Sequence, residues 1–202
     1  MSKNCFPGGI SVNALLAKIS KRREPDEKDQ EDHKDQIAIS SERHAADKMI
    51  KVLVMSDSHG AISELLEIIS AENPDIIIHL GDYASDCRAA AKKFPDIPLK
   101  IIGGNGDFSA TIPSEDFFVL GNKFIYATHG HRHSVKAGLS QLINFAKSKS
   151  AEIVLFGHTH IPHCEISENF AVINPGSVHP PYCSYAVLSL SGGDLSCEIK
   201  AL

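Results

Sequence analysis

The stretch that decides the fold is "IKVLVMSDSHG" at residues 50–60. Its first six residues form an apolar run of strand length, and an aspartate and a histidine two positions apart follow at once. Side chains at i and i+2 leave an extended segment on the same side, so Asp57 and His59 can face one point. The stretch therefore predicts a buried strand that ends in polar residues.

Alternating strand and helix patterns continue from this strand. "AISELLEIISAEN" (61–73) has apolar residues at helical spacing, and "DIIIHL" (75–80) is a second buried strand, so the three segments predict a β-α-β unit. We expect a central sheet covered by helices, to which later hairpins add antiparallel strands. Further helices are expected at 85–94 and 134–149, and further strands at 99–104, near 117–121, at 123–128 and 152–157, and near 170–175 and 184–190.

Length and composition favour a single globular domain. The chain has 202 residues, 43% of them hydrophobic and 22% charged, which is enough for one full core. No apolar run approaches the length of a membrane span, and the first residues lack the pattern of a secretory signal. The five cysteines are odd in number and contain no C-x-x-C pair. We therefore expect a cytoplasmic protein with reduced thiols and no membrane contact.

The chain divides near Met49 into an N-terminal extension, 1–48, and a domain, 49–202. Within the extension, residues 21–36 are a mixed-charge run without apolar periodicity, which predicts a solvated and mostly disordered linker. Residues 11–20 have the spacing of a short amphipathic helix. That helix is either a fraying terminal turn without a role or a segment that docks on the domain or on a partner.

The charge distribution bears on the substrate. Residues 1–48 carry nine basic and nine acidic side chains, so the net charge of −5 belongs to residues 49–202, with eleven basic and sixteen acidic side chains. A negative domain binds long nucleic acid poorly, because such binding requires many phosphates to be neutralised. We expect no long nucleic acid as a partner. Any phosphate-bearing substrate would need a local positive centre that the side chains do not provide.

Polar side chains follow five of the expected strands, at the point where each strand ends. In open α/β sheets ligands bind beyond the carboxyl ends of the strands, so these side chains would converge on one place. Each short motif is common by itself, and their occurrence together and in order predicts a metal site. The candidate residues are Asp57 and His59, then Asp82, then Asn105 and Asp107, then His129 and His131, and finally His158 and His160.

The donor types indicate two metal ions. Oxygen and imidazole donors without thiolates suit manganese, iron, zinc or nickel better than a structural zinc or a calcium site. Seven ligands are too many for one ion and fit two divalent ions, among which manganese is preferred; the seven are Asp57, His59, Asp82, Asn105, His129, His158 and His160. Two ions need a bridging ligand. Asp82, central in the order, is the candidate bridge.

Five motifs in this order resemble the calcineurin-like metallophosphoesterase superfamily, and its small YfcE-like phosphodiesterase branch in particular. The resemblance covers residues 49 to about 190, includes "NPGS" (174–177), and has no counterpart for the extension. It implies two facing mixed β-sheets flanked by helices, an α-β-β-α sandwich. It also implies Asp57, His59, Asp82 and His160 as ligands of one ion, and Asp82, Asn105, His129 and His158 as ligands of the other.

The implied activity is hydrolysis of a small phosphodiester. A hydroxide that bridges the two ions would attack phosphorus in line, since metal coordination lowers the pKa of water from 15.7 to ~7. Two ions, two aspartates and this hydroxide leave a centre of about +1, which is the local positive charge that the domain otherwise lacks.

One position departs from the family pattern. Many members carry a histidine after the asparagine of the third motif, where it assists the leaving group, whereas this chain has Gly106. The leaving-group acid is therefore unassigned. His131 is the preferred substrate-facing acid or phosphate contact, with a solvated or supporting histidine as the alternative. Asp107 is expected to orient a neighbouring ligand.

Two other functions are alternatives to this enzyme. A metallo-β-lactamase-type hydrolase would need an aspartate where His133 stands. A catalytically silent scaffold is the stronger rival, because the same fold serves the retromer complex in that way. A scaffold should have lost ligands, and here all seven positions are filled. A homo-oligomer is left open by the sequence.

Overall fold

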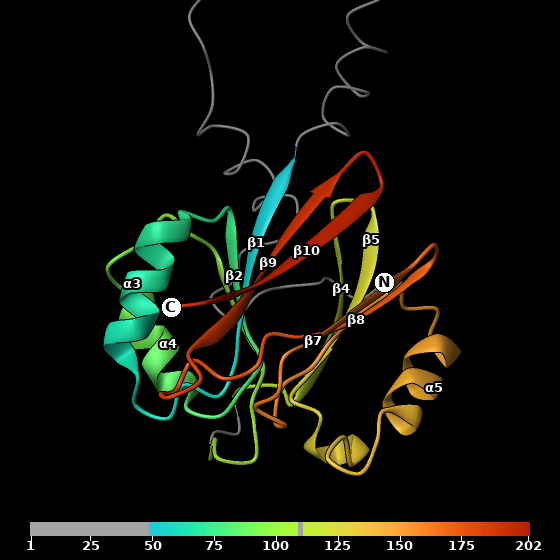
Figure 1. Ribbon diagram of the computed structural model, residues 1–202, viewed down its shortest axis with the longest axis horizontal. Helices are drawn as coiled ribbons and strands as arrows, with labels where there is room; N and C mark the ends of the chain where they lie inside the picture. The colour runs from blue at the N-terminus through green and yellow to red at the C-terminus, as the bar shows by residue number, and fades with distance from the viewer. Residues whose placement is uncertain (1–48, 109–110) are drawn as a thin grey trace, which may run out of the picture.

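The computed structural model describes residues 49–108 and 111–202 (Figure 1). Within these residues the strands form two five-stranded sheets, in the orders β10-β9-β1-β2-β3 and β4-β5-β6-β8-β7. The first sheet contains β1 (Ile50–Met55), β2 (Ile76–His79), β3 (Leu99–Ile101), β9 (Ser184–Ser191) and β10 (Asp194–Ala201). The second contains β4 (Glu115–Leu120), β5 (Lys123–Thr128), β6 (Ile153–Leu155), β7 (His163–Ser167) and β8 (Phe170–Asn174). The helices are α3 (Ile62–Glu72), α4 (Ala84–Ala91), α5 (Ser140–Ser148) and the 3-10 turn η1 (His131–His133).

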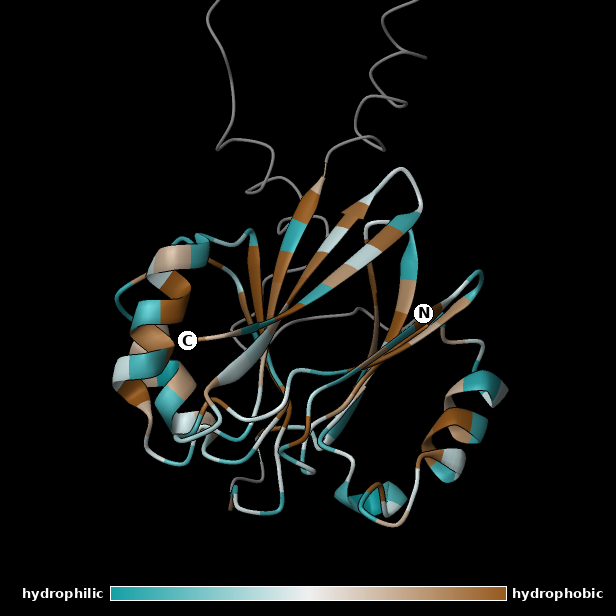
Figure 2. Cartoon of the chain, viewed as in Figure 1, coloured by the Kyte–Doolittle hydropathy of each residue, from teal (hydrophilic) through white to brown (hydrophobic). Residues whose placement is uncertain are grey.

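The two sheets pack face to face, with helices on their outer sides. A buried cluster that includes Val52, Ile78, Ile125 and Leu155 fills the space between the sheets. A second cluster joins the first sheet to α3 and α4, and a third joins the second sheet to α5. The helices turn their apolar stripes inward and their polar stripes outward (Figure 2). The predicted α-β-β-α sandwich is therefore confirmed.

The topology brings the carboxyl ends of the parallel strands together. β1, β2 and β3 run parallel in one sheet, and β5, β6 and β8 run parallel in the other. A backbone hydrogen bond from Asp57 N to Gly81 O (2.9 Å) ties the loops after β1 and β2, and one from Gly157 N to His129 O (3.1 Å) ties those after β5 and β6. These loops gather at the lower end of the molecule in Figure 1. They carry the candidate ligands.

Three elements differ from the sequence prediction. The helix expected at 134–149 begins only at Ser140, since Ser134 (φ 50°) and Gly138 (φ 147°) adopt left-handed conformations that a helix cannot contain. β7 and β10 were not predicted. Both are edge strands of their sheets, and their half-exposed positions leave no continuous apolar run to recognise.

Two predictions concern features that the structure does not test. The amphipathic segment 11–20 and the linker 21–36 lie outside the described residues. Among residues 49–108 and 111–202, no helix has the length and apolar character needed to cross a lipid bilayer.

Glu72, at the end of α3, ties that helix to the first sheet. Its buried carboxylate accepts a hydrogen bond from Tyr185 of β9 (2.9 Å) and pairs with Lys51 of β1 (2.7 Å) and Lys200 of β10 (3.1 Å). Burial raises the pKa of Glu72, but these partners lower it by more, to about 2 from 4.5. The group therefore stabilises the fold in its ionised form.

We expect a stability loss in acid that depends on Glu72. Because the folded pKa is depressed, the stabilisation is present above pH 4.5 and disappears as the pH falls from 4.5 to about 2. At about 1.36 kcal/mol per unit it amounts to about 3 kcal/mol. Urea unfolding of metal-free protein should show Glu72→Gln destabilised by about this amount at neutral pH and by much less near the folded pKa. A deficit that is the same at both pH values would contradict this account.

Candidate metal centre

The first candidate ligand group joins the loops after β1 and β6. Ligand atoms of Asp57, His59 and His160 lie within 4.8 Å of one another. The Asp57 carboxylate is fully buried, whereas the two imidazoles are partly exposed on the solvent side. The geometry leaves one open face above a buried negative charge, as a catalytic metal site requires.

The two oxygens of Asp57 have different surroundings. Oδ2 accepts hydrogen bonds from Ser56 Oγ (2.6 Å) and His158 N (3.0 Å), which fix the carboxylate. Oδ1 is buried and makes no hydrogen bond to any described residue, and the same is true of His59 Nε2. Three imidazole Nε2 atoms face Oδ1, those of His160 at 3.2 Å, His129 at 3.9 Å and His59 at 4.0 Å. A buried carboxylate oxygen surrounded by imidazole nitrogens is the environment that a divalent cation satisfies.

The second group joins the loops after β2, β5 and β6. It consists of Asp82, His129 and His158, again with ligand atoms within 4.8 Å of one another. His129 Nδ1 donates to the carbonyl of Leu80 (2.8 Å), which leaves the Nε2 lone pair free to face the site. That Nε2 lies 3.5 Å from Asp82 Oδ2 and 3.2 Å from His158 Nδ1. This orientation of a ligand histidine by a backbone carbonyl is typical of protein metal sites.

Asp82, a member of the second group, also faces the first group. Its Oδ1 accepts a hydrogen bond from Gly106 N (2.7 Å), and its Oδ2 is 3.5 Å from His129 Nε2 and 3.9 Å from His59 Nε2. One carboxylate oxygen thus faces a histidine of each group. This is the position that a bridging ligand of two ions would occupy.

The pKa values follow from burial and from these contacts. Burial raises the pKa of Asp82, but the neighbouring His129 and the hydrogen bond from Gly106 N lower this pKa by more, so the carboxyl stays ionised. Burial lowers the pKa of His158 to about 4, with the His129 charge and Lys136 acting in the same direction. For His129 the Asp82 and Asp57 carboxylates outweigh burial and raise the pKa. The site is therefore an anionic cluster that attracts positive charge.

Five of the seven candidate ligands have left-handed backbone conformations. Positive φ is uncommon outside glycine and costs of order 1–3 kcal/mol per residue, and such residues cluster at functional sites. Each conformation turns the chain sharply at a strand end so that the side chain faces the cluster. The five are Asp57 (φ 53°), His59 (φ 42°), Asp82 (φ 55°), His158 (φ 68°) and His160 (φ 60°).

Two glycines allow the loops to approach one another. A Cβ on Gly104 would lie 2.1 Å from Asp82 Oδ1 and 2.4 Å from Asp82 N, and a Cβ on Gly157 would lie 2.1 Å from Ser56 Oγ. Distances of this size are impossible for real atoms, so the motifs Gly104-Asn105 and Gly157-His158 need glycine at these positions. Each of these motifs therefore places a candidate ligand directly after the glycine that permits its close packing.

Three other predicted site residues lie at the edge of the cluster. Asn105 occupies an exposed turn after β3, and its role as a ligand stays a prediction. Asp107 accepts hydrogen bonds from Ala84 N (2.8 Å) and Gly104 N (2.9 Å), so its carboxylate holds the turn against the start of α4. The half-buried ring of His131 lies 5.5 Å from that of His129 and 6.2 Å from that of His158, between ring centroids. The catalytic roles of Asp107 and His131 also stay predictions.

Several residues support the ligand loops although no local pattern predicts their roles. Ser177 Oγ donates to Asp57 O (2.8 Å), and Asn174 Nδ2 donates to Gly157 O (3.0 Å), so the "NPGS" segment supports the loops after both β1 and β6. His179, which follows this segment closely in the chain, has its ring 5.9 Å from that of His59. The "NPGS" motif was the available signal, but nothing local indicates what it contacts.

Comparison with known proteins agrees with this site. The model of the calcineurin-like phosphoesterase superfamily domain matches residues 50–193. The chain belongs to this superfamily. "Probable metallophosphoesterase YsnB" of Bacillus subtilis is 35% identical over 147 residues, which cover 70% of this chain and 85% of that protein. "Phosphodiesterase MJ0936" of Methanocaldococcus jannaschii is 31% identical over 170 residues, covering 75% and 95%.

Solved structures of the superfamily fold match over similar lengths. A predicted phosphoesterase from Streptococcus pneumoniae has a TM-score of 0.64 and 25% identity over 76% of this chain and 90% of its own. Vacuolar Protein Sorting 29 from Cryptosporidium parvum has a TM-score of 0.62 at 16% identity, covering 76% and 98%, and this likeness concerns the fold alone. The predicted superfamily is thus confirmed, and with it the prediction of a metallophosphoesterase.

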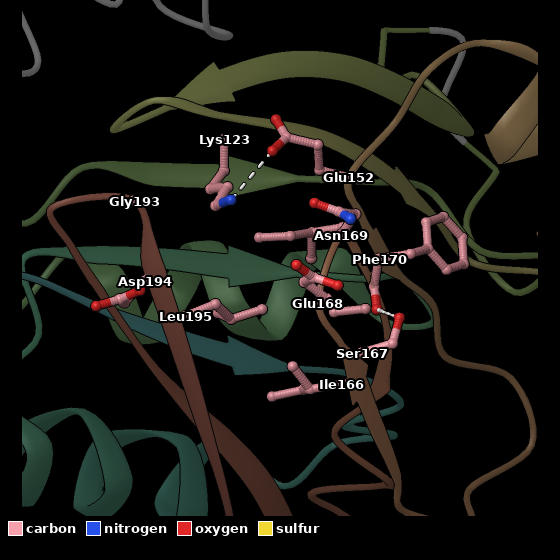
Figure 3. A pocket seen from close by; sticks show the side chains of 12 residues that line it. Lys123, Glu152, Ile166, Ser167, Glu168, Asn169, Phe170, Gly193, Asp194 and Leu195 are labelled. Carbon is pink, nitrogen blue, oxygen red and sulfur yellow. Dashed lines mark hydrogen bonds and ion pairs between the residues drawn. The ribbon is translucent and has the colours of Figure 1, made fainter.

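A separate cavity of about 260 Å³ lies at the opposite end of the strands (Figure 3). It is lined by the starts of β5 and β6 and by the turns of the β7–β8 and β9–β10 hairpins, where Lys123 lies 3.1 Å from Glu152. The candidate ligands follow the other ends of β5 and β6. This cavity is therefore not part of the metal centre.

Proposed function

We propose that the chain is a dinuclear metal-dependent phosphodiesterase that cleaves small phosphodiesters, with manganese as its native metal. The observation that supports this most is the pairing of two His/Asp groups around Asp82, with Asp57 Oδ1 and His59 Nε2 buried and making no hydrogen bond within residues 49–108 and 111–202. One ion would take Asp57, His59, Asp82 and His160, and the other Asp82, Asn105, His129 and His158.

The bound ions would supply positive charge against the phosphate and a water whose pKa is lowered to ~7. Two divalent ions and two aspartates sum to about +2, within a domain whose side chains sum to −5. The site itself, and not the surface, would then attract a phosphodiester. The buried positions of Asp57 and Asp82 keep water from screening this charge.

Residues around the ligands would bind and orient the substrate. His131 is partly exposed beside His129, so its ring is placed to contact a phosphate oxygen of a substrate bound at the ions. Gly106 offers no proton to the leaving group. We therefore expect esters with stable leaving groups, such as nitrophenolate, to be cleaved much faster than alkyl esters.

Hydrolysis of bis(4-nitrophenyl) phosphate and of 4-nitrophenyl phosphate tests this function. Chelator-stripped protein should be inactive, and refilling with manganese should restore diesterase activity above monoesterase activity. His158→Ala should lower diesterase activity more than about a hundredfold, since even partners that only orient a metal ligand contribute 10–100-fold.

His44→Ala, in the N-terminal extension, is the matched control and should leave turnover unchanged. Full activity in the presence of chelator would contradict the mechanism. Absence of turnover with manganese, nickel, zinc and magnesium, despite two bound ions, would favour the catalytically silent scaffold.

A further inference from the structure

A second cavity, of about 320 Å³, lies beside the metal centre. It is formed by the segment after η1 and by the loop after β6, which are the segments that follow His131 and His158 in the chain. Its floor is apolar and buried, with Phe156 and Val135 at its base. The complete lining is Val135, Lys136, Leu139, Phe156, Thr159, Ile161, Pro162 and His163.

The cavity adjoins the candidate ligands directly. Thr159 stands in the chain between His158 and His160 and also lines the cavity. Val135, another lining residue, packs against Gly130, which stands between His129 and His131: a Cβ on Gly130 would lie 2.9 Å from Val135 Cγ2. A molecule with its phosphate at the metal centre can therefore extend an organic group into this cavity past Thr159.

The wall nearest the metal centre is rigid. Thr159 Oγ1 accepts hydrogen bonds from Asn174 Nδ2 (3.0 Å) and Ile161 N (3.2 Å), and the same Asn174 amide holds Gly157 O (3.0 Å). These bonds fix the loop between two ligand histidines. The cavity is thus preformed, as small-molecule sites usually are.

Exposed apolar side chains also gather on the loops around the centre. Ile161, directly after His160, is 68% exposed, and Tyr83, directly after Asp82, is 45% exposed with its ring 4.9 Å from that of His59. Folding does not require an isoleucine in water at the rim of a polar site. Such a residue gains contact when an apolar group of a substrate covers it.

We propose that this cavity binds the apolar organic group of one ester arm, so that the substrates are phosphodiesters with an arm about the size of an aromatic ring. The inference rests on the proposed phosphodiesterase function and specifies its substrate class. Ile161 and Leu139 would contact the organic group. Lys136 would lie at the edge, where its charge favours the phosphate.

Binding of phenylphosphonate and methylphosphonate tests this inference without turnover, because neither has an ester bond to hydrolyse. Calorimetry on manganese-loaded protein should show phenylphosphonate bound about tenfold more tightly than methylphosphonate, a difference of about 1.4 kcal/mol. Ile161→Asp should bring the two affinities to the same value, since repulsion between its carboxylate and the phosphonate group lowers both affinities equally while the apolar contact is lost. Ile166→Asp, at a half-exposed isoleucine on β7 that lines the separate cavity, should keep it.

Each outcome bears on a distinct claim. Equal affinity for the two phosphonates, or a preference that survives Ile161→Asp, would overturn the cavity's role and leave the phosphodiesterase in place. If neither phosphonate binds to protein that holds two ions, the proposed function fails together with the cavity.

Discussion

Asp82→Asn is expected to lose both metal ions and to reduce diesterase activity by more than about a hundredfold. Asp82 Oδ2 faces His129 of one ligand group and His59 of the other, so its charge contributes to both. An asparagine has the same shape but offers one neutral oxygen. Metal content of the purified variant and its kcat/KM for bis(4-nitrophenyl) phosphate measure the two losses.

Asp116→Asn is the matched control for this substitution. Asp116, on β4, pairs with Lys100 and lies outside both ligand groups. The control should keep two ions per chain and full activity. An Asp82→Asn protein that retains both ions would contradict the bridging position, even if its activity fell.

Gly104→Ala is expected to destabilise the fold by about 2–3 kcal/mol and to weaken metal binding. Its Cβ would lie 2.4 Å from the backbone nitrogen of Asp82 and 2.1 Å from Oδ1, so the loops after β2 and β3 must separate. Separation breaks the hydrogen bond from Gly106 N that fixes the Asp82 carboxylate. Urea unfolding and manganese titration measure both effects.

The neighbouring residue Gly103 supplies the control. A Cβ there would meet Ile112 Cγ2 at 3.4 Å, which is ordinary contact. Gly103→Ala should therefore change stability and metal affinity little. Equal effects of the two substitutions would show that the close approach at Gly104 does not determine the site.

The candidate ligands could be predicted from the sequence because each follows an apolar strand. The run at 50–55 identifies β1, and Asp57 and His59 follow it, so topology alone places them at the common strand end. Because both faces of each sheet are buried, the parallel strands also appear in the sequence as nearly continuous apolar runs. The fold class and the set of candidate ligands therefore rest on local patterns, whereas the division of the ligands between two ions came from the family resemblance.

The remaining features depend on contacts between distant segments. Asp57 is fixed by the backbone of His158, 101 residues later, and Ser177 supports it from 120 residues away. No local pattern encodes these bonds. The left-handed backbone of Ser134 likewise interrupts the start of a segment whose apolar spacing predicts a helix. The cavity beside Ile161 forms only when the loops pack together.

The most direct test of the dinuclear centre is an anomalous difference map from crystals of the full chain grown with manganese. The account predicts two peaks roughly 3.5–4 Å apart, with Asp82 between them. The first peak should lie at Asp57, His59 and His160, and the second at His129 and His158. A single peak, or manganese bound away from these residues, would contradict the account.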